Sequence, residues 1–317
     1  MPEVITIGEI LVEVMAKDVG QTFLEPGLWQ APYPSGAPAI FISQAARFGA
    51  SAGMVGCVGD DDFGRLNINR LKADGVDVGG ITVSGTLPTG CAFVTYRADG
   101  GRSFIYHIPN SAAGQINPDQ IGEGWLADCR CLHVMGSSFS IPGVYESVEK
   151  CARVVKGNGG KISFDPNIRP ELLDRNPAMR ERIMWVLERT DLLLPGLDEL
   201  PALTGESDLD KALAKLFADT PVSQIVVKMA AKGCCYADRA ERFMVEPFAV
   251  EEVDPTGAGD CFGGALVAGL MRGDSIRRAV TLAAAAGALA VTRKGPMEGA
   301  SFLADCERFA GARLAGL

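Results

Sequence analysis

Residues 252–264 read EVDPTGAGDCFGG and carry the strongest structural signal in the 317-residue chain. An acidic loop with a proline leads into a Gly-Ala-Gly turn, and apolar side chains then recur at helical spacing. Glycines permit unusual backbone dihedrals and let another group approach the main chain. The N–H groups of Gly257, Ala258 and Gly259 would point out of the helix N-terminus, where unpaired donors and the helix dipole favour an anion. The stretch therefore predicts a phosphate site at the start of a late helix.

Asp260 ends this turn, and a carboxylate beside a phosphate site needs a role of its own because it repels the phosphate. One role is to accept the proton of a hydroxyl group that attacks the γ-phosphate of a nucleotide. The alternative is a first-turn helix residue that only interacts with the helix dipole. Asp254, six residues upstream, and the neighbouring glycines favour the catalytic interpretation. The spacing GxGxxxG differs from the dinucleotide pattern GxGxxG, and no GxxxxGKS or GxxxxGKT segment occurs.

Working outward from this stretch, short apolar runs alternate with helical patterns along the chain. The helical patterns include 41–48 and 144–155, whose apolar residues share one face. Runs that are apolar throughout are typical of strands covered on both faces. This alternation predicts a three-layer α/β/α fold with a mostly parallel central sheet. The predicted strands are 4–8, 54–58, 131–135, 161–165, 191–194 and 225–228.

A different pattern interrupts this order. Segments 12–15, 90–97 and 102–108 alternate in polarity or carry aromatic residues, and the last two flank the hairpin signal ADGG at 98–101. They predict a small antiparallel β-sheet outside the main layer, formed by insertions at about 10–35 and 88–110. We expect it to act as a lid on a single domain that spans residues 1–317, because no internal repeat or flexible linker divides the chain.

The composition excludes several classes of protein. A chain that is 47% hydrophobic and 22% charged has material for a real core, so it is not disordered. Lys and Arg number 30 and Asp and Glu number 39, a net charge of −9, which argues against nucleic-acid binding. The longest apolar stretch, 279–291, is shorter than the ~20 residues that a membrane span needs. The start, MPEVITIGEI, has no signal-peptide pattern, so we expect no membrane association.

The cysteines point to a reducing compartment. All nine are scattered, no CxxC pair occurs, and only two histidines are present, which argues against a zinc site. Thiols that stay free suit the cytoplasm, which is the location we expect. We expect His133, in an apolar strand, to be a core residue and His107 to be a structural or surface residue.

Five motifs in a fixed order carry a resemblance to a known family. The stretch DPTGAGDCFGG resembles the C-terminal signature of the ribokinase-like (PfkB) carbohydrate kinases. PSGAPA at 34–39 resembles their N-terminal signature, and VGCVGDDDFG at 55–64 resembles the segment that adjoins it. DPNIRP at 165–170 and VTRKG at 291–295 also match. The resemblance spans nearly the whole chain and implies a three-layer α/β domain with a β lid.

The resemblance also implies a reaction. It implies ATP as phosphoryl donor, Mg²⁺ as cofactor with K⁺ as a further candidate, and a sugar hydroxyl as acceptor. By position, Asp260 is the base and Gly257, Ala258 and Gly259 form the anion hole. Asp254 and the carbonyl of Thr256 match the monovalent-cation loop, Lys228 and Gly233 match the nucleotide site, and Glu199 matches the residue that holds Mg²⁺ through water.

The sugar site follows from the same resemblance and from the residues near the predicted lid. Glu13 and the backbone of Gly36 and Ala37 would hold sugar hydroxyls. Arg102 and Tyr106, on the lid hairpin, and Arg169, after a strand end, would contact the substrate. Each of these residues also has an alternative interpretation without a ligand. The hairpin residues could form a dimer contact or ordinary strand packing, and Arg169 could form a structural ion pair. Lys228 could extend its ammonium group from an apolar strand to solvent.

The sequence departs from the family pattern at four positions. Ile40 stands where the family has a sugar-binding Asn, Gly196 replaces the Asn of a PNxxE motif, Glu13 replaces an Asp, and Ala230 replaces a Gly. Because the catalytic turn is intact, these changes indicate altered sugar specificity.

We expect a ketohexose kinase of the tagatose or fructose type. The alternatives are a 2-keto-3-deoxygluconate kinase, whose substrate carboxylate Arg102, Tyr106 and Arg169 could bind, then a ribokinase or nucleoside kinase. A non-catalytic sugar sensor on the same fold is the alternative from a different class. We also expect a homodimer, because lid sheets in this family often pair between subunits.

Overall fold

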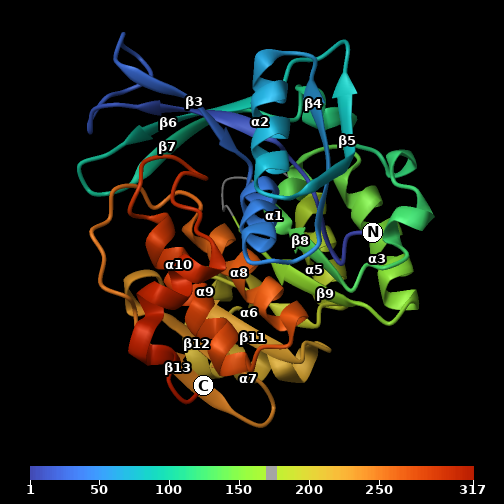
Figure 1. Cartoon of the computed structure of the whole chain (residues 1–317), viewed down its shortest axis with the longest axis vertical. Coiled ribbons are helices and arrows are strands. Elements are labelled where there is room, and N and C mark those ends of the chain that lie inside the picture. Colours follow the sequence, from blue (N-terminus) through green and yellow to red (C-terminus); the bar gives the residue numbers. More distant parts are fainter. Residues whose placement is uncertain (169–176) are drawn as a thin grey trace.

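A nine-stranded sheet forms the middle layer of the computed structural model, which describes residues 1–168 and 177–317 (Figure 1). Its order is β13-β12-β11-β10-β9-β8-β1-β4-β5; neighbours from β5 to β11 are parallel, and β12 and β13 are antiparallel. The predicted mostly parallel sheet is therefore confirmed. Its strands are β1 (Val4–Ile7), β4 (Ala52–Gly59), β5 (Asp77–Ser84), β8 (Cys131–Met135), β9 (Lys161–Asp165), β10 (Leu192–Leu193), β11 (Gln224–Lys228), β12 (Cys234–Ala237) and β13 (Arg242–Val245).

Helices cover both faces of this sheet because its central strands are apolar on both sides. Consecutive residues of β1 belong to different cores: Val4 packs in one cluster and Ile5 in the other. The cluster around Val4 holds α1 (Ala37–Arg47), α2 (Asp62–Ala73), α8 (Ala258–Arg272), α9 (Ile276–Ala290) and α10 (Leu303–Ala310). The cluster around Ile5 holds α3 (Val144–Gly157), α5 (Pro177–Leu187), α6 (Leu200–Thr204) and α7 (Leu209–Asp219).

A second, smaller sheet stands apart from the central one (Figure 1). The predicted hairpin is present as β6 (Gly90–Tyr96) and β7 (Arg102–His107), which pair antiparallel. β2 (Leu11–Ala16) joins β6 in parallel and β3 (Trp29–Ser35) in antiparallel fashion, so the order is β3-β2-β6-β7. The parallel pairing of β2 with β6 was not predicted; it joins two segments about 80 residues apart in sequence.

Short 3₁₀ helices complete the described chain, and no helix in its described ranges is long and apolar enough to cross a bilayer. The apolar stretch 279–291 lies almost entirely within α9, which packs against α8 and α10. The 3₁₀ helices are Ala112–Gln115, Pro118–Gln120, Glu123–Leu126, Gly136–Ser140, Leu197–Glu199, Ala230–Lys232 and Gly311–Leu314.

Candidate functional site

The turn before α8 opens into a large cavity. Gly257 caps the helix in the left-handed conformation with φ 81°, and a Cβ there would lie only 2.3 Å from the carbonyl oxygen of Pro296. Only glycine fits this position without displacing the backbone. Residues 257–260 all line a cavity of about 1230 Å³ that reaches from the small sheet to the ends of the central strands. The first amides of α8, which lack partners within the helix, therefore lie beside open space.

Two acidic residues and a lysine gather at the ends of neighbouring central strands. Lys228, the last residue of β11, forms an ion pair with Asp165, the last residue of β9. Glu199 accepts hydrogen bonds from the backbone N–H groups of Gly196, at 2.5 Å, and Ile168. Burial, and then the nearby charge of Asp165, raise the pKa of Glu199 to about 7. The site therefore holds a fixed cation and a carboxyl group that changes charge near neutral pH.

Asp254 connects three parts of the chain. One of its carboxylate oxygens accepts hydrogen bonds from the N–H and hydroxyl groups of Thr256, at 3.1 and 2.7 Å. The other accepts from the N–H of Gly295 at 3.0 Å and lies 3.5 Å from the hydroxyl group of Tyr96 on β6. Asp254 is only 1% exposed. It therefore holds the turn before α8, the 291–295 loop and the small sheet together.

The far end of the cavity carries one carboxylate from β2 and one from the segment between β1 and β2. Glu13 is buried and accepts a hydrogen bond from the hydroxyl group of Ser35 at 2.7 Å, while Gly36 and Ala37 line the cavity beside it. Glu9 was not singled out from the sequence, yet it is buried, lines the same cavity and accepts a 2.6 Å hydrogen bond from Ser138. Its position directly after Gly8, at the end of an apolar strand, is the sequence feature that could have identified it.

Arg102, Phe104 and Tyr106 of β7 line the cavity together, as strand alternation predicted. The rings of Phe104 and Tyr106 stack with centroids 5.2 Å apart. A guanidinium nitrogen of Arg102 donates to the hydroxyl oxygen of Thr256 at 2.8 Å. The small sheet is thus hydrogen-bonded directly to the turn before α8.

The remaining predicted residues fall into three groups. Gly233 lines the cavity with φ 80°, and Ile40 also lines it, with Cγ2 3.3 Å from the position of a Cβ on Gly257. Arg169 lies outside the described residues. His133 is a buried core residue that stacks on Phe41 and is hydrogen-bonded to Ser163. His107 is exposed on β7.

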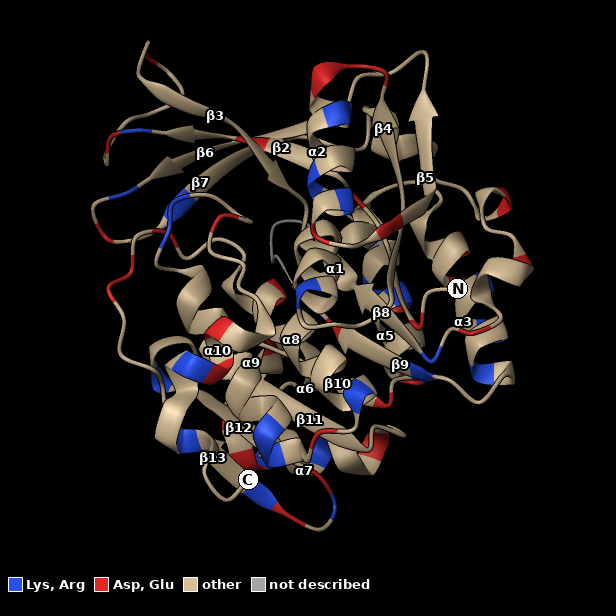
Figure 2. Ribbon diagram, in the orientation of Figure 1, with Lys and Arg blue, Asp and Glu red and all other residues tan. Residues whose placement is uncertain are grey.

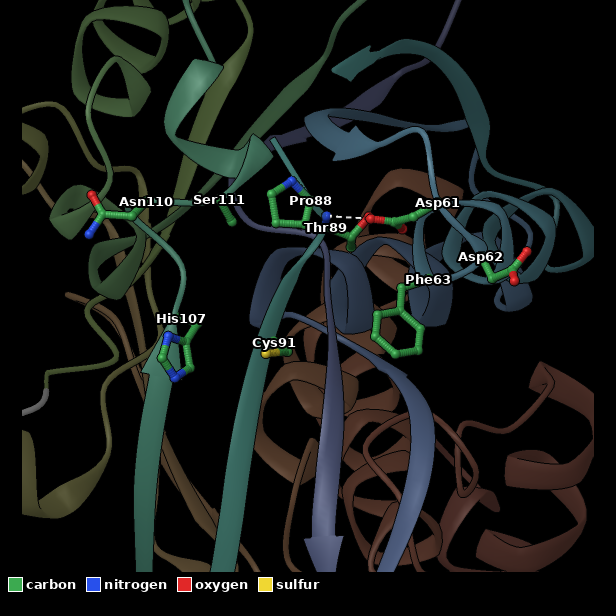
Figure 3. A pocket seen from close by; sticks show the side chains of 9 residues that line it. All are labelled: Asp61, Asp62, Phe63, Pro88, Thr89, Cys91, His107, Asn110 and Ser111. Carbon is green, nitrogen blue, oxygen red and sulfur yellow. Dashed lines mark hydrogen bonds between the residues drawn. The ribbon is translucent and has the colours of Figure 1, made fainter. Parts of the chain in front are cut away.

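A second hollow of about 600 Å³ lies at the base of the small sheet (Figure 3). It is lined by Cys91 and His107, which face each other across β6 and β7. Their neighbours Ala92 and Tyr106 line the large cavity, so the hollow lies on the opposite face of the sheet. Asp61 borders it but accepts hydrogen bonds from Gly64 and Thr89, which gives it a structural role.

Charge on the surface follows no single pattern. In the view of Figure 2, basic and acidic segments are interleaved along α2 and α10, and no basic stripe runs across the elements shown. Several of these charges pair, as Arg278 of α9 does with Glu307 of α10 at 2.5 Å. The elements in this view therefore mix charges of both signs.

Comparison with known proteins gives consistent matches over the whole chain. The pfkB family of carbohydrate kinases matches residues 1–302. Fructokinase-1 of Oryza sativa subsp. japonica is 32% identical over 301 residues, which are 92% of this chain and 92% of that protein. A candidate ribokinase II of E. coli, solved with ATP and Mg²⁺, is 50% identical with a TM-score of 0.92 and covers 98% of this chain and 99% of its own. A double mutant of the Vibrio cholerae fructokinase, solved with fructose, ADP and a potassium ion, is 28% identical with a TM-score of 0.86 and covers 98% of this chain and 99% of its own.

Proposed function

The chain belongs to the pfkB family of carbohydrate kinases, and from that premise we propose that it transfers the γ-phosphoryl group of ATP to a hydroxyl group of a ketohexose. The observation that carries the proposal is the cavity, which has the turn 257–260 on one side and the carboxylate of Glu13 on the other. A nucleotide phosphate and a sugar hydroxyl can meet in this space. We propose fructose as the first substrate to test and tagatose as the second, because the relatives named above include two fructokinases.

In the proposed reaction, Asp260 accepts the proton of the attacking hydroxyl group. The amides of Gly257, Ala258 and Gly259 donate to the phosphoryl oxygens, whose negative charge must be balanced in the transition state. No proton transfer from the amides is needed, since they act as fixed dipoles. This division of roles is supported by the position of Asp260 in the first turn of α8, next to the three amides.

The sugar is proposed to lie between Glu13, Gly36 and Ala37 on one side and the small sheet on the other. Tyr106 and Arg169 are proposed to contact it. A guanidinium group has five N–H donors, so the bond from Arg102 to Thr256 leaves donors for a sugar oxygen. We propose that the small sheet acts as a lid that excludes water from the reacting groups.

Lys228 and Gly233 are proposed to contact the nucleotide. Oxygen donors in the cavity wall fit the hard cations that the family uses. Glu199, which is 9% exposed and lines the cavity, would hold Mg²⁺ through water. Asp254, with the carbonyl group of Thr256, would contribute to a K⁺ site at the junction of two loops. When bound, these cations neutralise phosphate charge and stiffen the loop.

A screen of sugars tests the function. Purified protein with ATP and Mg²⁺ is assayed for ADP release with fructose, tagatose, 2-keto-3-deoxygluconate, ribose and nucleosides, with and without K⁺. We expect the highest kcat/KM with a ketohexose. The highest value with 2-keto-3-deoxygluconate or ribose would replace the substrate assignment. A sensor would bind a sugar and release no ADP with any of them, and that result would overturn the proposed activity.

The outer face of the small sheet supports a further proposal, that the protein is a homodimer. Phe93 and Ile105 pair across β6 and β7, and Trp29 packs edge-to-face on Phe93. Ile105 is 41% exposed and also borders the cavity. Exposed apolar side chains on one sheet face favour burial against a second copy. A cytoplasmic location is proposed as well, in agreement with nine cysteines that are all free thiols, eight of them buried.

A further inference from the structure

Asp165 and Lys228 form a largely buried ion pair at the cavity. Asp165 is the last residue of β9 and its side chain is 2% exposed; Lys228 ends β11 and its side chain is 20% exposed. The two strands are separated by β10, which has only two residues and ends at Leu193. The segment after β10 still runs beside β11, since Gly196 forms an isolated bridge with Lys228, and the two side chains meet across this segment.

Both oxygens of Asp165 are engaged. One oxygen accepts a hydrogen bond from the ammonium group of Lys228, and the other accepts a hydrogen bond from the backbone N–H of Asn167 at 3.1 Å. A carboxylate held at both oxygens has a fixed rotamer, so it also fixes the group bonded to it. The Lys228 ammonium is therefore kept at one place in the cavity wall, although a lysine side chain is otherwise flexible.

That place adjoins the catalytic turn. A Cβ on Gly259 would lie 3.4 Å from the Lys228 Nζ atom, so the ammonium lies close to the turn of the proposed anion hole. Asp260, in the same turn, is close enough to act on the charge of Lys228. The ammonium thus lies between the group that anchors it and the turn where phosphoryl transfer is proposed.

Three acidic groups act on this ammonium: Asp165 of β9, Glu199 after β10 and Asp260 of α8. His133 of β8 is also near it, but burial and then the charge of Lys228 lower the pKa of its imidazole, so it stays neutral. Burial alone would lower the pKa of Lys228, but Asp165 and then Glu199 more than offset it, so the pKa lies above its ordinary value. Lys228 therefore stays positive.

We propose that Asp165 is a positioning residue for phosphoryl transfer, which fixes the ammonium of Lys228 beside the anion hole so that a preplaced positive charge meets the phosphoryl group. This inference rests on the proposed function and adds Asp165 to it, as a residue that acts through Lys228. Preplaced charge costs no reorganisation during the reaction, so its loss should reduce kcat more than it weakens sugar binding.

The chain offers a matched control. Asp191 also pairs with a lysine, Lys156, at 2.9 Å, and also accepts a backbone N–H, that of Ile162 at 2.7 Å. It lies at the start of β10, away from the cavity lining. An aspartate-to-asparagine change there removes the same kind of ion pair without touching the proposed site.

The experiment compares Asp165→Asn, Lys228→Met, the double variant and Asp191→Asn for kcat, KM of sugar and ATP, and Tm. We expect Asp165→Asn to lower kcat about tenfold or more, with the KM of the sugar within about twofold. Added to Lys228→Met, it should lower kcat by less than about twofold further, because its target is already gone. Asp191→Asn should keep kcat, because its ion pair lies away from the cavity.

Three results would overturn the inference. The first is an unchanged kcat in folded Asp165→Asn, and the second is an equal kcat loss in Asp191→Asn. The third is a double variant whose fold-loss in kcat equals the product of the fold-losses in the two single variants. If Asp165→Asn does not fold, Asp165→Glu replaces it, with an expected kcat between those of wild type and Lys228→Met; a wild-type kcat would contradict the inference. The proposed function fails separately, when the wild-type protein releases no ADP with any sugar.

Discussion

Gly257 and Ala230 both adopt positive φ beside the cavity, at 81° and 49°, but only the first is a glycine. At Gly257 the neighbouring carbonyl of Pro296 leaves no room for a side chain. Ala230 is exposed, so its side chain has room, but its left-handed backbone conformation is unfavourable. The cost of this conformation is about 1 kcal/mol for a residue with a Cβ. The departure noted in the sequence, Ala in place of a family Gly, thus has a conformational consequence.

Replacing Ala230 by glycine should stabilise the protein. The strain relieved exceeds the extra freedom that glycine gains in the unfolded chain, so we expect a gain of up to about 1 kcal/mol and a rise in Tm of about 2 °C. Ala231→Gly is the control, because Ala231 is exposed without a positive φ and the same change there should lower Tm. Equal shifts in thermal unfolding for the two variants would contradict the interpretation.

Glu199 should make stability depend on pH. Burial, and then repulsion by Asp165, raise its pKa from 4.5 to about 7, so the folded state keeps a proton that the unfolded state has lost between these values. The free energy of unfolding should therefore fall as pH rises from about 4.5 to 7. Thermal unfolding of the nucleotide-free protein without divalent cations should show this fall, and Glu199→Gln should remove part of it. Parallel pH profiles for both proteins would refute the prediction.

At the scale of elements, the contact between the small sheet and the turn before α8 is the feature that joins the two ends of the cavity. Arg102 of β7 donates a hydrogen bond to Thr256, and the hydroxyl group of Tyr96 of β6 lies near Asp254. Two strands of the small sheet therefore contact the same loop. The loop is in turn fixed to Gly295 through Asp254. The position of the small sheet and the geometry of the turn are therefore linked.

Loss of this link should weaken catalysis. A hydrogen bond from a charged donor contributes about 1.5–3 kcal/mol, so Arg102→Met should lower kcat/KM for the sugar about tenfold or more. Arg97→Met on the same sheet is the control, because Arg97 pairs with the exposed Asp99 at the hairpin. The link would be unimportant if steady-state kinetics gave the two variants the same kcat/KM.

The elements that the sequence predicted well are those with an unambiguous apolar pattern. Segments 131–135 and 161–165 are strands with the predicted bounds, because they are buried on both faces. β5 was missed, since it lies at the sheet edge with an irregular burial pattern and two glycines, and so was β13, which is mostly exposed. A strand at an edge packs on fewer neighbours and carries a weaker signal.

Single residues of the candidate site could be predicted from the sequence, but contacts between residues far apart in sequence could not. The turn 257–260 could be recognised, because four consecutive residues form it. The pair of Asp165 and Lys228 could not, because 63 residues separate the partners and only the order of β9, β10 and β11 brings them together. Glu9 was missed for a related reason, since its partner Ser138 is 129 residues away.

At the scale of the whole molecule, the two sheets differ in how they are covered. Both faces of the central sheet carry helices, whereas the small sheet has one face on the cavity and the other exposed around Phe93 and Ile105. A second copy of the chain could cover the apolar side chains of Phe93 and Ile105.

The dimer proposal predicts a specific loss of assembly. In sedimentation velocity the wild-type protein should be a dimer, and Ile105→Asp should be a monomer, because a charge on the covered face cannot be solvated. Met244→Asp on β13, 47% exposed at the opposite edge of the central sheet, should remain a dimer. A monomeric wild type, or a dimeric Ile105→Asp, would rule out this interface.

The most direct measurement is the kcat of Asp260→Asn with the best sugar, alongside calorimetric binding of that sugar to the same variant. Asparagine has nearly the shape of aspartate but cannot accept the proton, so kcat should fall by about 10²–10⁴-fold while the Kd of the sugar stays within about twofold. Turnover close to wild type, with unimpaired sugar binding, would contradict proton transfer to Asp260.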